Sequence, residues 1–172
     1  MDHIEIERKF LLKKEAIPER FFTYPHKELV AAYLSSAPVI RIRREGGEYI
    51  LTYKNHTADS PLARTEYNLP LDAASFEHLL PKADGNIIEK TRYYIPLAEA
   101  YLKKSRLPDF CRSLVVEMDL FAGRLSPLAV AEVEFQSEED AAAFTPPEWF
   151  GRDVSLDPAY TNVSLSQNDM LA

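Results

Sequence analysis

Cysteine is almost absent from this sequence: Cys111 is the single cysteine in 172 residues. One cysteine excludes an internal disulfide framework. The chain also lacks a long uncharged apolar run and a signal-peptide pattern, so we expect a cytoplasmic protein with no membrane partner. Basic residues are outnumbered, and the formal net charge of −7 argues against general attraction to nucleic acid or anionic lipid. A local basic cluster is still compatible with this acidic total.

Histidine is also scarce, and its four copies are dispersed without metal-ligand spacing. We interpret His3, His26, His56 and His78 as surface or capping residues rather than catalytic ones. Cys111 has no evident nucleophilic partner, so we expect it to be inert. Trp149 and Phe150 are expected to anchor the C-terminal part of the chain by apolar burial.

The length and the hydrophobic content of 46% fit one globular domain, residues 1–172, with a substantial core. Short strand-like segments follow one another, separated by turns rich in Pro, Gly, Asp and Asn. They are predicted at 3–12, 28–35, 38–45, 48–55, 62–70, 87–96, 114–121 and 129–136. Their number predicts an α+β, mainly β fold: a closed antiparallel barrel of eight strands with a few outer helices.

Turns and helices can be placed between these strands. Gly46 and Gly47 predict a tight hairpin, because glycine accepts a positive φ at low cost. Helical spacing predicts helices from Asp72 to Lys82 and from Ser137 to Phe144, with Ser137 as a possible N-cap. A shorter helix is expected at 13–22. Residues 98–113 are interpreted as a helix and loop with a solvated charged face, and residues 145–166, interrupted by prolines, as loops or short turns covering one barrel end.

Charged side chains recur at alternate positions along nearly every predicted strand. Glu5, Glu7 and Lys9 share one face of the first strand, whereas Ile4 and Ile6 lie on the other. An open sheet with one solvated face would explain this pattern for any single strand. Its recurrence instead favours charged faces that line the barrel interior, with apolar faces packed against outer helices. The positions are Lys9, Arg41, Arg43, Lys54, Arg64, Lys90 and Arg92, with Glu5, Glu7, Glu66, Glu117, Asp119, Glu132 and Glu134.

A tunnel with both signs of charge suits a polyanion that is bound together with a divalent metal. Six or seven Lys and Arg side chains can pair with several phosphate oxygens at once. The carboxylates would repel one another, by about 4 kcal/mol for unit charges 4 Å apart at an effective dielectric near 20, unless a cation relieves the repulsion. Oxygen ligands suit Mg²⁺ or Mn²⁺. The pattern therefore predicts a metal phosphate ligand.

The same residues resemble a known family. Glu5-Ile6-Glu7-Arg8-Lys9 has the form E-x-E-x-K, and five further charged sites follow in the expected order: Arg41-Ile42-Arg43, Lys54, Lys90-Thr91-Arg92, Glu117-Met118-Asp119 and Glu132-Val133-Glu134. The chain resembles CYTH proteins of the triphosphate tunnel metalloenzyme superfamily from residue 3 to about 166. E-x-E-x-K alone is a weak motif, but the ordered series is specific.

This resemblance implies metal-dependent hydrolysis of a triphosphate, most simply inorganic triphosphate, by water attack on the terminal phosphorus. The implied phosphate-binding residues are Lys9, Arg41, Arg43, Lys54, Arg64, Lys90 and Arg92. The implied metal ligands are Glu5, Glu7, Glu132, Glu134 and Asp119. The implied catalytic residues are Glu5, Glu7, Lys9, Lys54, Glu117 and Asp119, and a homodimer is possible because it is common in related proteins.

One position departs from the family pattern, and several functions remain open. Related proteins often have R-x-E-x-E where this chain has Arg64-Thr65-Glu66-Tyr67-Asn68, so Asn68 removes one negative charge from the tunnel wall. The alternatives are a thiamine triphosphatase, a nucleoside triphosphatase, a class IV type adenylate cyclase and a non-catalytic polyphosphate sensor. Tyr33, Tyr49, Tyr53 and Tyr94 are interpreted as packing residues rather than base-stacking ones. Tyr160 and Asn162 are hypothesised to belong to a lid.

Overall fold

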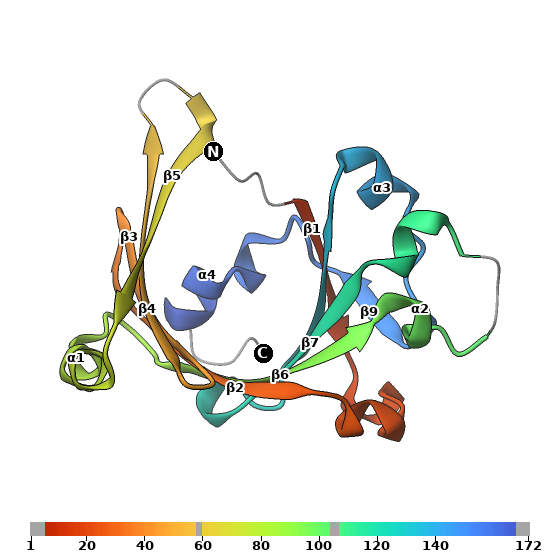
Figure 1. Ribbon diagram of the computed structural model, residues 1–172, viewed down its shortest axis with the longest axis horizontal. Coiled ribbons are helices and arrows are strands. Elements are labelled where there is room, and N and C mark those ends of the chain that lie inside the picture. The colour runs from red at the N-terminus through yellow and green to blue at the C-terminus, as the bar shows by residue number, and fades with distance from the viewer. Residues whose placement is uncertain (1–5, 58–59, 104–106, 168–172) are drawn as a thin grey trace.

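A computed structural model describes residues 6–57, 60–103 and 107–167, with the side chains of residues 56–65 outside that description. Nine antiparallel strands form one strongly curved sheet in the order β5-β4-β3-β2-β6-β7-β8-β1-β9 (Figure 1). The strands are β1 (Ile6–Leu12), β2 (His26–Ser36), β3 (Val39–Glu45), β4 (Glu48–Thr57), β5 (Ser60–Leu71), β6 (Ile88–Pro96), β7 (Val115–Phe121), β8 (Ala129–Phe135) and β9 (Phe150–Asp153).

The prediction of a closed eight-stranded barrel is wrong. Closure would require β5 to pair with β1, but β1 is already paired on both sides, with β8 along most of its length and with β9 at Phe10 and Leu12. The ninth strand, β9, lies in the proline-rich segment, for which only loops or short turns were predicted. It occupies the edge of β1 that closure needs. The sheet is therefore open between β5 and β9, and its curvature leaves a concave face between two walls (Figure 1).

Two of the predicted helices are present in the structure, and a third prediction differs from it. The α1 helix (Ala73–Leu79) is capped by Asp72 and continues into η3 (Leu80–Lys82), and α3 (Glu138–Ala143) is capped by the predicted Ser137. The predicted helix at 13–22 is instead two 3-10 turns, η1 (Lys14–Ala16) and η2 (Glu19–Thr23). The remaining elements are α2 (Leu97–Ala100), η4 (Asp109–Arg112), η5 (Gly123–Leu125), η6 (Pro158–Tyr160) and α4 (Asn162–Gln167).

The predicted hairpin is confirmed between β3 and β4. Gly46 has a φ of +60°, in the left-handed region where glycine has no steric penalty from a Cβ atom. Together with Gly47 it joins the paired residues Glu45 and Glu48. This turn fixes the register in which Arg41 and Arg43 lie on the concave face.

The apolar core lies mainly on the convex face of the sheet. Phe10, Met118 and Val133 are almost fully buried in a cluster that α2, α3 and Trp149 cover. A second cluster packs Ile42 and Val30 of the sheet against α1. Because alternate side chains point to opposite faces of a strand, burial of these residues on the convex side directs their charged neighbours into the concavity.

One end of the concave face is apolar rather than charged. Tyr33, Ile88 and Val130 share the concave side of their strands with the charged residues and pack with Leu165 of α4. Figure 1 shows α4 across the space between the two walls. The charged region is therefore bounded at one end by an apolar cluster. None of the helices within the described ranges is long and apolar enough to cross a membrane.

Candidate functional site

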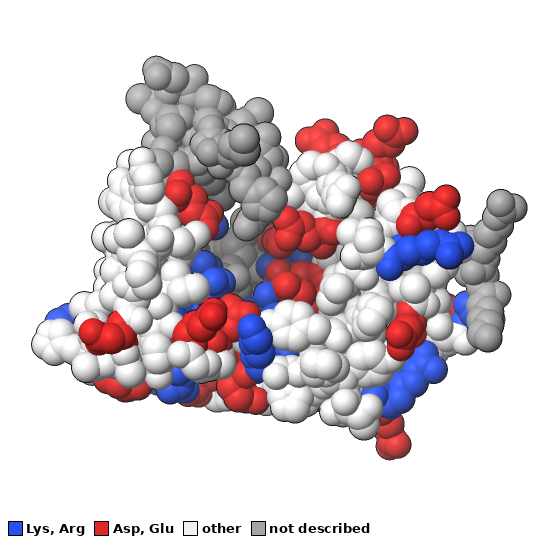
Figure 2. Space-filling view, in the orientation of Figure 1, with Lys and Arg blue, Asp and Glu red and all other residues white. Residues whose placement is uncertain are grey.

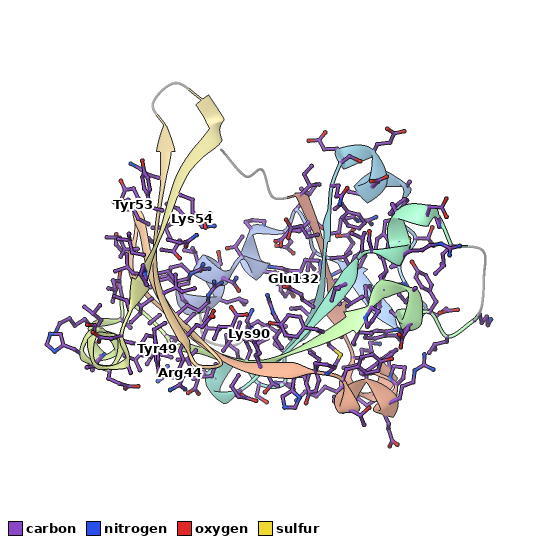
Figure 3. All side chains as sticks on the ribbon, in the orientation of Figure 1. Arg44, Tyr49, Tyr53, Lys54, Lys90 and Glu132 are labelled. Atoms are coloured by element: carbon purple, nitrogen blue, oxygen red, sulfur yellow. The ribbon has the colours of Figure 1, made fainter. Side chains whose placement is uncertain are left out.

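Most strands of the sheet contribute charged side chains to the concave face, where both signs of charge surround the hollow in Figure 2. Figure 3 shows Lys54, Lys90 and Glu132 on this side of the sheet and Tyr49 and Tyr53 on the convex side. The register explains the grouping, because Lys9 pairs with Glu132, and Glu132 pairs with Glu117 on the next strand. The prediction that these charged residues share one face is confirmed for the described side chains.

Asp119 is the fully buried centre of the acidic and basic contacts. Its Oδ2 accepts hydrogen bonds from Lys90 Nζ at 2.5 Å and Arg92 Nη2 at 2.7 Å, and its Oδ1 accepts from Arg92 Nε at 2.7 Å. Burial alone would raise the pKa of Asp119, but the charge of Lys90 and the hydrogen bonds from Arg92 outweigh burial and lower it. Asp119 is therefore ionised and holds two basic side chains in place.

Arg92 links the basic and acidic parts of the site. Besides Asp119, its guanidinium pairs with Glu117 and lies 3.7 Å from Glu132. Burial would lower the pKa of Arg92, but its carboxylate partners raise it overall. Three carboxylates around one guanidinium leave this cation less available to a phosphate than the sequence implied.

Arg41 and Arg43 have the opposite environment. The Nε atoms of both are buried and have no hydrogen-bond partner, although Glu45 Oε2 lies 3.6 Å from Arg43 Nε. Burial and the neighbouring charge of Arg41 lower the pKa of Arg43. A buried donor without an acceptor costs about 1 to 3 kcal/mol, and more when it is charged. This pair of guanidinium groups is therefore preorganised for an anion that would accept these hydrogen bonds.

The departure at Asn68 has a structural consequence. Asn68 Oδ1 accepts a hydrogen bond from Thr52 Oγ1 at 2.6 Å, and its amide donates to Glu66 Oε1 at 3.1 Å. Glu66 in turn pairs with Lys54 at 2.9 Å. Burial would raise the pKa of Glu66, but the hydrogen bonds from Lys54 and Asn68 lower it. An amide thus orients Glu66 where a second carboxylate would have repelled it.

Four glutamates line a separate acidic cavity of about 200 Å³ beside this cationic region: Glu7, Glu117, Glu132 and Glu134. Glu132 Oε1 is buried and accepts no hydrogen bond, with the Lys9 ammonium 3.4 Å away. Burial raises the pKa of Glu117, and the charges of Glu132 and Asp119 add to the shift. In the described ranges, no three His, Cys, Asp or Glu side chains are arranged closely enough to hold a metal ion as they stand. The donor chemistry nevertheless fits a hard divalent cation.

The described structure brings together most of the predicted site residues. Lys9, Lys54, Lys90 and the three arginines Arg41, Arg43 and Arg92 lie on the concave face with the acidic residues. Glu5 and the side chain of Arg64 lie outside the described residues, so their predicted roles are unchanged. Metal ligation by Asp119 also stays a prediction.

Sequence reasoning missed three contributors to the site. Thr52 is fully buried on the same face as Lys54, and strand alternation was sufficient to find it. Tyr94 donates its hydroxyl to Glu45 at 3.0 Å, and burial raises its pKa to about 12. Tyr160 was hypothesised only as part of a lid, and the contact of its carbonyl, which accepts from Lys9 Nζ at 3.2 Å, had no sequence signal because the carbonyl is a backbone group.

The fold and site define a class of proteins with a curved antiparallel sheet and a concave face of interleaved acidic and basic residues. The family model described as CYTH domain matches residues 3–153, so the chain belongs to the CYTH domain family. The family resemblance drawn from the sequence is therefore confirmed.

Relatives and solved structures agree with this assignment. An inorganic triphosphatase of Nitrosomonas europaea is 39% identical over 94% of this chain and 96% of its own length. An inorganic triphosphatase of Acetivibrio thermocellus is 28% identical over 95% of this chain and 94% of its own length. A crystal structure of an inorganic triphosphatase, 36% identical, covers 97% of both chains with a TM-score of 0.69.

Proposed function

We propose that this protein hydrolyses inorganic triphosphate within the concave face, with the aid of a divalent cation. The observation that carries the proposal is the pair of buried Arg41 and Arg43 Nε groups without acceptors, on the same face as a cavity lined by four glutamates. Both relatives described above are inorganic triphosphatases and match the chain over nearly its whole length.

The described cations divide into three groups with different roles. Arg41 and Arg43 are the primary anion-binding groups, because a phosphate chain would supply their missing acceptors. Lys9 and Lys54 each already lie near one carboxylate and add movable point charges at the two walls. Lys90 and Arg92 are fixed by Asp119 at the floor of the concavity, where carboxylates offset much of their charge. Arg64 joins this set as a prediction from the sequence.

The acidic cavity is the proposed site for Mg²⁺ or Mn²⁺. Glu7, Glu132 and Glu134 would hold the cation, with Glu5 as a further predicted ligand. The buried Glu132 oxygen accepts no hydrogen bond, and the neighbouring carboxylates help to raise the pKa of Glu117, so a cation would relieve the crowding of negative charge here. When bound, a divalent cation supplies charge neutralisation for the carboxylates and the phosphate oxygens.

The side chains can account for the bonding changes of the reaction. A water oxygen forms a bond to the terminal phosphorus while the adjacent anhydride P–O bond breaks, giving orthophosphate and pyrophosphate. Glu117 lines the cavity and has a raised pKa, which makes it the carboxylate best suited to accept the proton from water. Arg41, Arg43 and Lys54 stabilise the charge that develops on the phosphate oxygens.

The defining experiment measures phosphate release from inorganic triphosphate, thiamine triphosphate and ATP with Mg²⁺, Mn²⁺ or EDTA, and follows cyclic AMP in the ATP samples. We expect metal-dependent release that is fastest from inorganic triphosphate. Glu134→Gln should lower turnover with little change in melting temperature, whereas the matched variant Glu138→Gln, on the outer helix α3, should not. Cyclic AMP as the main product would establish a cyclase. Tight triphosphate binding without turnover would establish a sensor.

A further inference from the structure

We propose that the C-terminal strap, residues Asp153–Tyr160, positions the Lys9 ammonium for the phosphate chain. This inference rests on the proposed function, because it assigns the strap a role in presenting a phosphate-binding lysine. The strap lies far from Lys9 in the sequence but is bonded to its backbone and to its side chain. These contacts distinguish it from a segment that only covers the core.

The strap bonds the backbone of Lys9 at both its amide and its carbonyl. The Lys9 amide donates to Ser155 Oγ at 2.9 Å, and the Val154 amide donates to the Lys9 carbonyl at 2.8 Å. Ser155 is itself fixed, because its backbone amide donates to Asp153 Oδ1 at 2.9 Å. Rotation of the first strand around Lys9 would break both of the bonds between Lys9 and the strap.

The strap also holds the side chain of Lys9. Its Nζ donates to the carbonyl oxygen of Tyr160 at 3.2 Å and lies 3.4 Å from Glu132 Oε1. An ammonium has three N–H groups, and the bond to Tyr160 uses one of them, so N–H groups remain for a phosphate oxygen. The Tyr160 carbonyl is neutral, and it therefore orients the ammonium without cancelling its charge. A second carboxylate at this position would have neutralised the cation that the substrate needs.

The Tyr160 carbonyl is placed by a turn whose supports lie outside the concave charge cluster. Asp157 Oδ1 accepts from the Ala159 amide at 3.1 Å, and the Tyr160 amide donates to the Asp157 carbonyl at 3.1 Å. Arg152 lies 3.4 Å from Asp157 Oδ2, and its guanidinium carbon is 5.5 Å from the centre of the Tyr160 ring. Asp157 and Arg152 can therefore be replaced without removing a charge from the proposed binding site.

The neighbouring arginine ties the strap to the sheet on the convex side. Arg8 Nη2 donates to Asp153 Oδ2 at 2.7 Å, and its Nη1 donates to the carbonyls of Ala141 and Phe144. Burial would raise the pKa of Asp153, but the hydrogen bonds from Ser155 and Arg8 lower it. Adjacent residues on β1 thus engage the strap from opposite faces: Arg8 anchors it, and Lys9 is positioned by it.

The test is a double-mutant cycle between Asp157 and Lys9, with inorganic triphosphate as the probe. Asp157→Ala removes the acceptor for the Ala159 amide, whereas Asp157→Asn keeps a side-chain oxygen that can accept it. We expect Asp157→Ala to raise KM and the Kd measured by calorimetry in EDTA by about five- to tenfold, with a smaller change in kcat. Asp157→Asn should stay within about twofold. In a Lys9→Ala background, Asp157→Ala should have no further effect on either quantity.

Equal effects of Asp157→Ala in both backgrounds would overturn the proposal, since they would show that the strap acts only through general stability. Arg152→Ala is the second variant if Asp157→Ala does not fold. We expect it to raise KM and Kd by a smaller factor, and to have no effect on either in the Lys9→Ala background. Melting temperatures of all variants separate folding from positioning. If the wild-type protein fails to hydrolyse or bind inorganic triphosphate, the proposed function fails. If it succeeds and the cycle is additive, only the role of the strap fails.

Discussion

At the scale of single residues, the two arginines of β3 show a conflict between stability and binding. Arg43 is held near Arg41 in a partly buried site, and burial together with this like charge lowers its pKa. The folded protein therefore bears a cost for keeping Arg43 charged. An anion bound between the two side chains would offset that cost.

We expect Arg43→Met to raise the melting temperature in phosphate-free buffer, because it removes a disfavoured buried charge and keeps apolar volume. The same variant should weaken triphosphate binding by tenfold or more, since it removes a charged hydrogen-bond donor. Thermal unfolding and calorimetric titration measure the two effects. Arg44→Met, on the convex side, is the matched control and should leave binding unchanged. A lower melting temperature together with unchanged affinity in Arg43→Met would contradict the assignment.

Asp119 illustrates the reverse case, in which a buried charge is stabilising. Asp119→Asn leaves Lys90 and Arg92 without their central partner, so we expect the free energy of unfolding to fall by about 3 kcal/mol at pH 7. Glu66→Gln breaks the more exposed pair with Lys54 and should cost less than about 1 kcal/mol. Urea unfolding measures both. Because the pKa of Asp119 is lowered in the folded state, its contribution is present above its ordinary value of 3.8 and is lost as the pH falls through the folded value. Equal costs for the two variants would contradict the central role of Asp119.

Glu117 has a raised pKa, so the sign of its contribution is reversed. Its ionisation is unfavourable in the folded state, and Glu117→Gln should therefore raise the melting temperature by a few degrees at pH 7 in EDTA. The gain should disappear as the pH falls through the ordinary value of 4.5, where the wild-type carboxyl is protonated in both the folded and unfolded states. Melting curves from pH 4 to pH 8 test this expectation. A gain that persists at pH 4 would show that charge is not the cause.

At the scale of elements, β9 decides the shape of the sheet although it has only four residues. It occupies the free edge of β1 and leads directly into the strap. Gly151 permits this close pairing, because a Cβ atom there would lie 2.7 Å from the carbonyl oxygen of Leu11. Such a contact with backbone cannot be relieved by rotation of a side chain.

Gly151→Ala is expected to lower the free energy of unfolding by about 1 to 3 kcal/mol, because the added methyl group forces β9 away from β1. Gly47→Ala, at a position with no atom within 4 Å of the added Cβ, is the control and should change stability by less than about 0.5 kcal/mol. Urea unfolding compares the two variants. Equal stabilities would show that the β1–β9 edge tolerates displacement.

At the scale of the whole molecule, an acidic protein presents a local cationic site to a polyanion. The net charge of −7 opposes the approach of triphosphate at long range, whereas in the proposed function Arg41, Arg43 and the lysines would attract it at short range. Salt screens both effects, but the partly buried short-range contacts are screened less. Partial burial of the charges on the concave face therefore limits how much the overall negative charge weakens triphosphate binding.

Raising NaCl from about 0.05 M to about 0.5 M should increase KM for inorganic triphosphate by severalfold, because screening shortens the Debye length and weakens the attraction between the cations and phosphate oxygens. Steady-state kinetics at fixed free metal concentration measures the change. Lys54→Gln should show a shallower salt dependence than the wild type. A KM that falls with salt would indicate that repulsion by the net charge dominates.

The alternation of charged and apolar residues in the sequence was sufficient to predict most of the strands and the set of charged residues on one face of the sheet. Alternation along the strands placed Lys9, Arg41 and Glu132 on one face because side-chain direction follows from backbone geometry alone. The Gly46 turn and the Ser137 cap were likewise local features that the residue types specify. The ordered charge pairs were sufficient to identify the CYTH family.

Only the tertiary structure decided which charges neutralise one another and whether the sheet closes. The sequence could not show that Arg92 is surrounded by carboxylates while the Arg41 Nε lacks an acceptor, since these contacts depend on curvature and register across several strands. It also could not show that a four-residue strand from the proline-rich segment occupies the edge of β1, because so short a segment has little periodicity. The long-range contacts of the strap with Lys9 depend on this same edge. Local chemistry thus selected the residues, and the packing of distant segments fixed their partners.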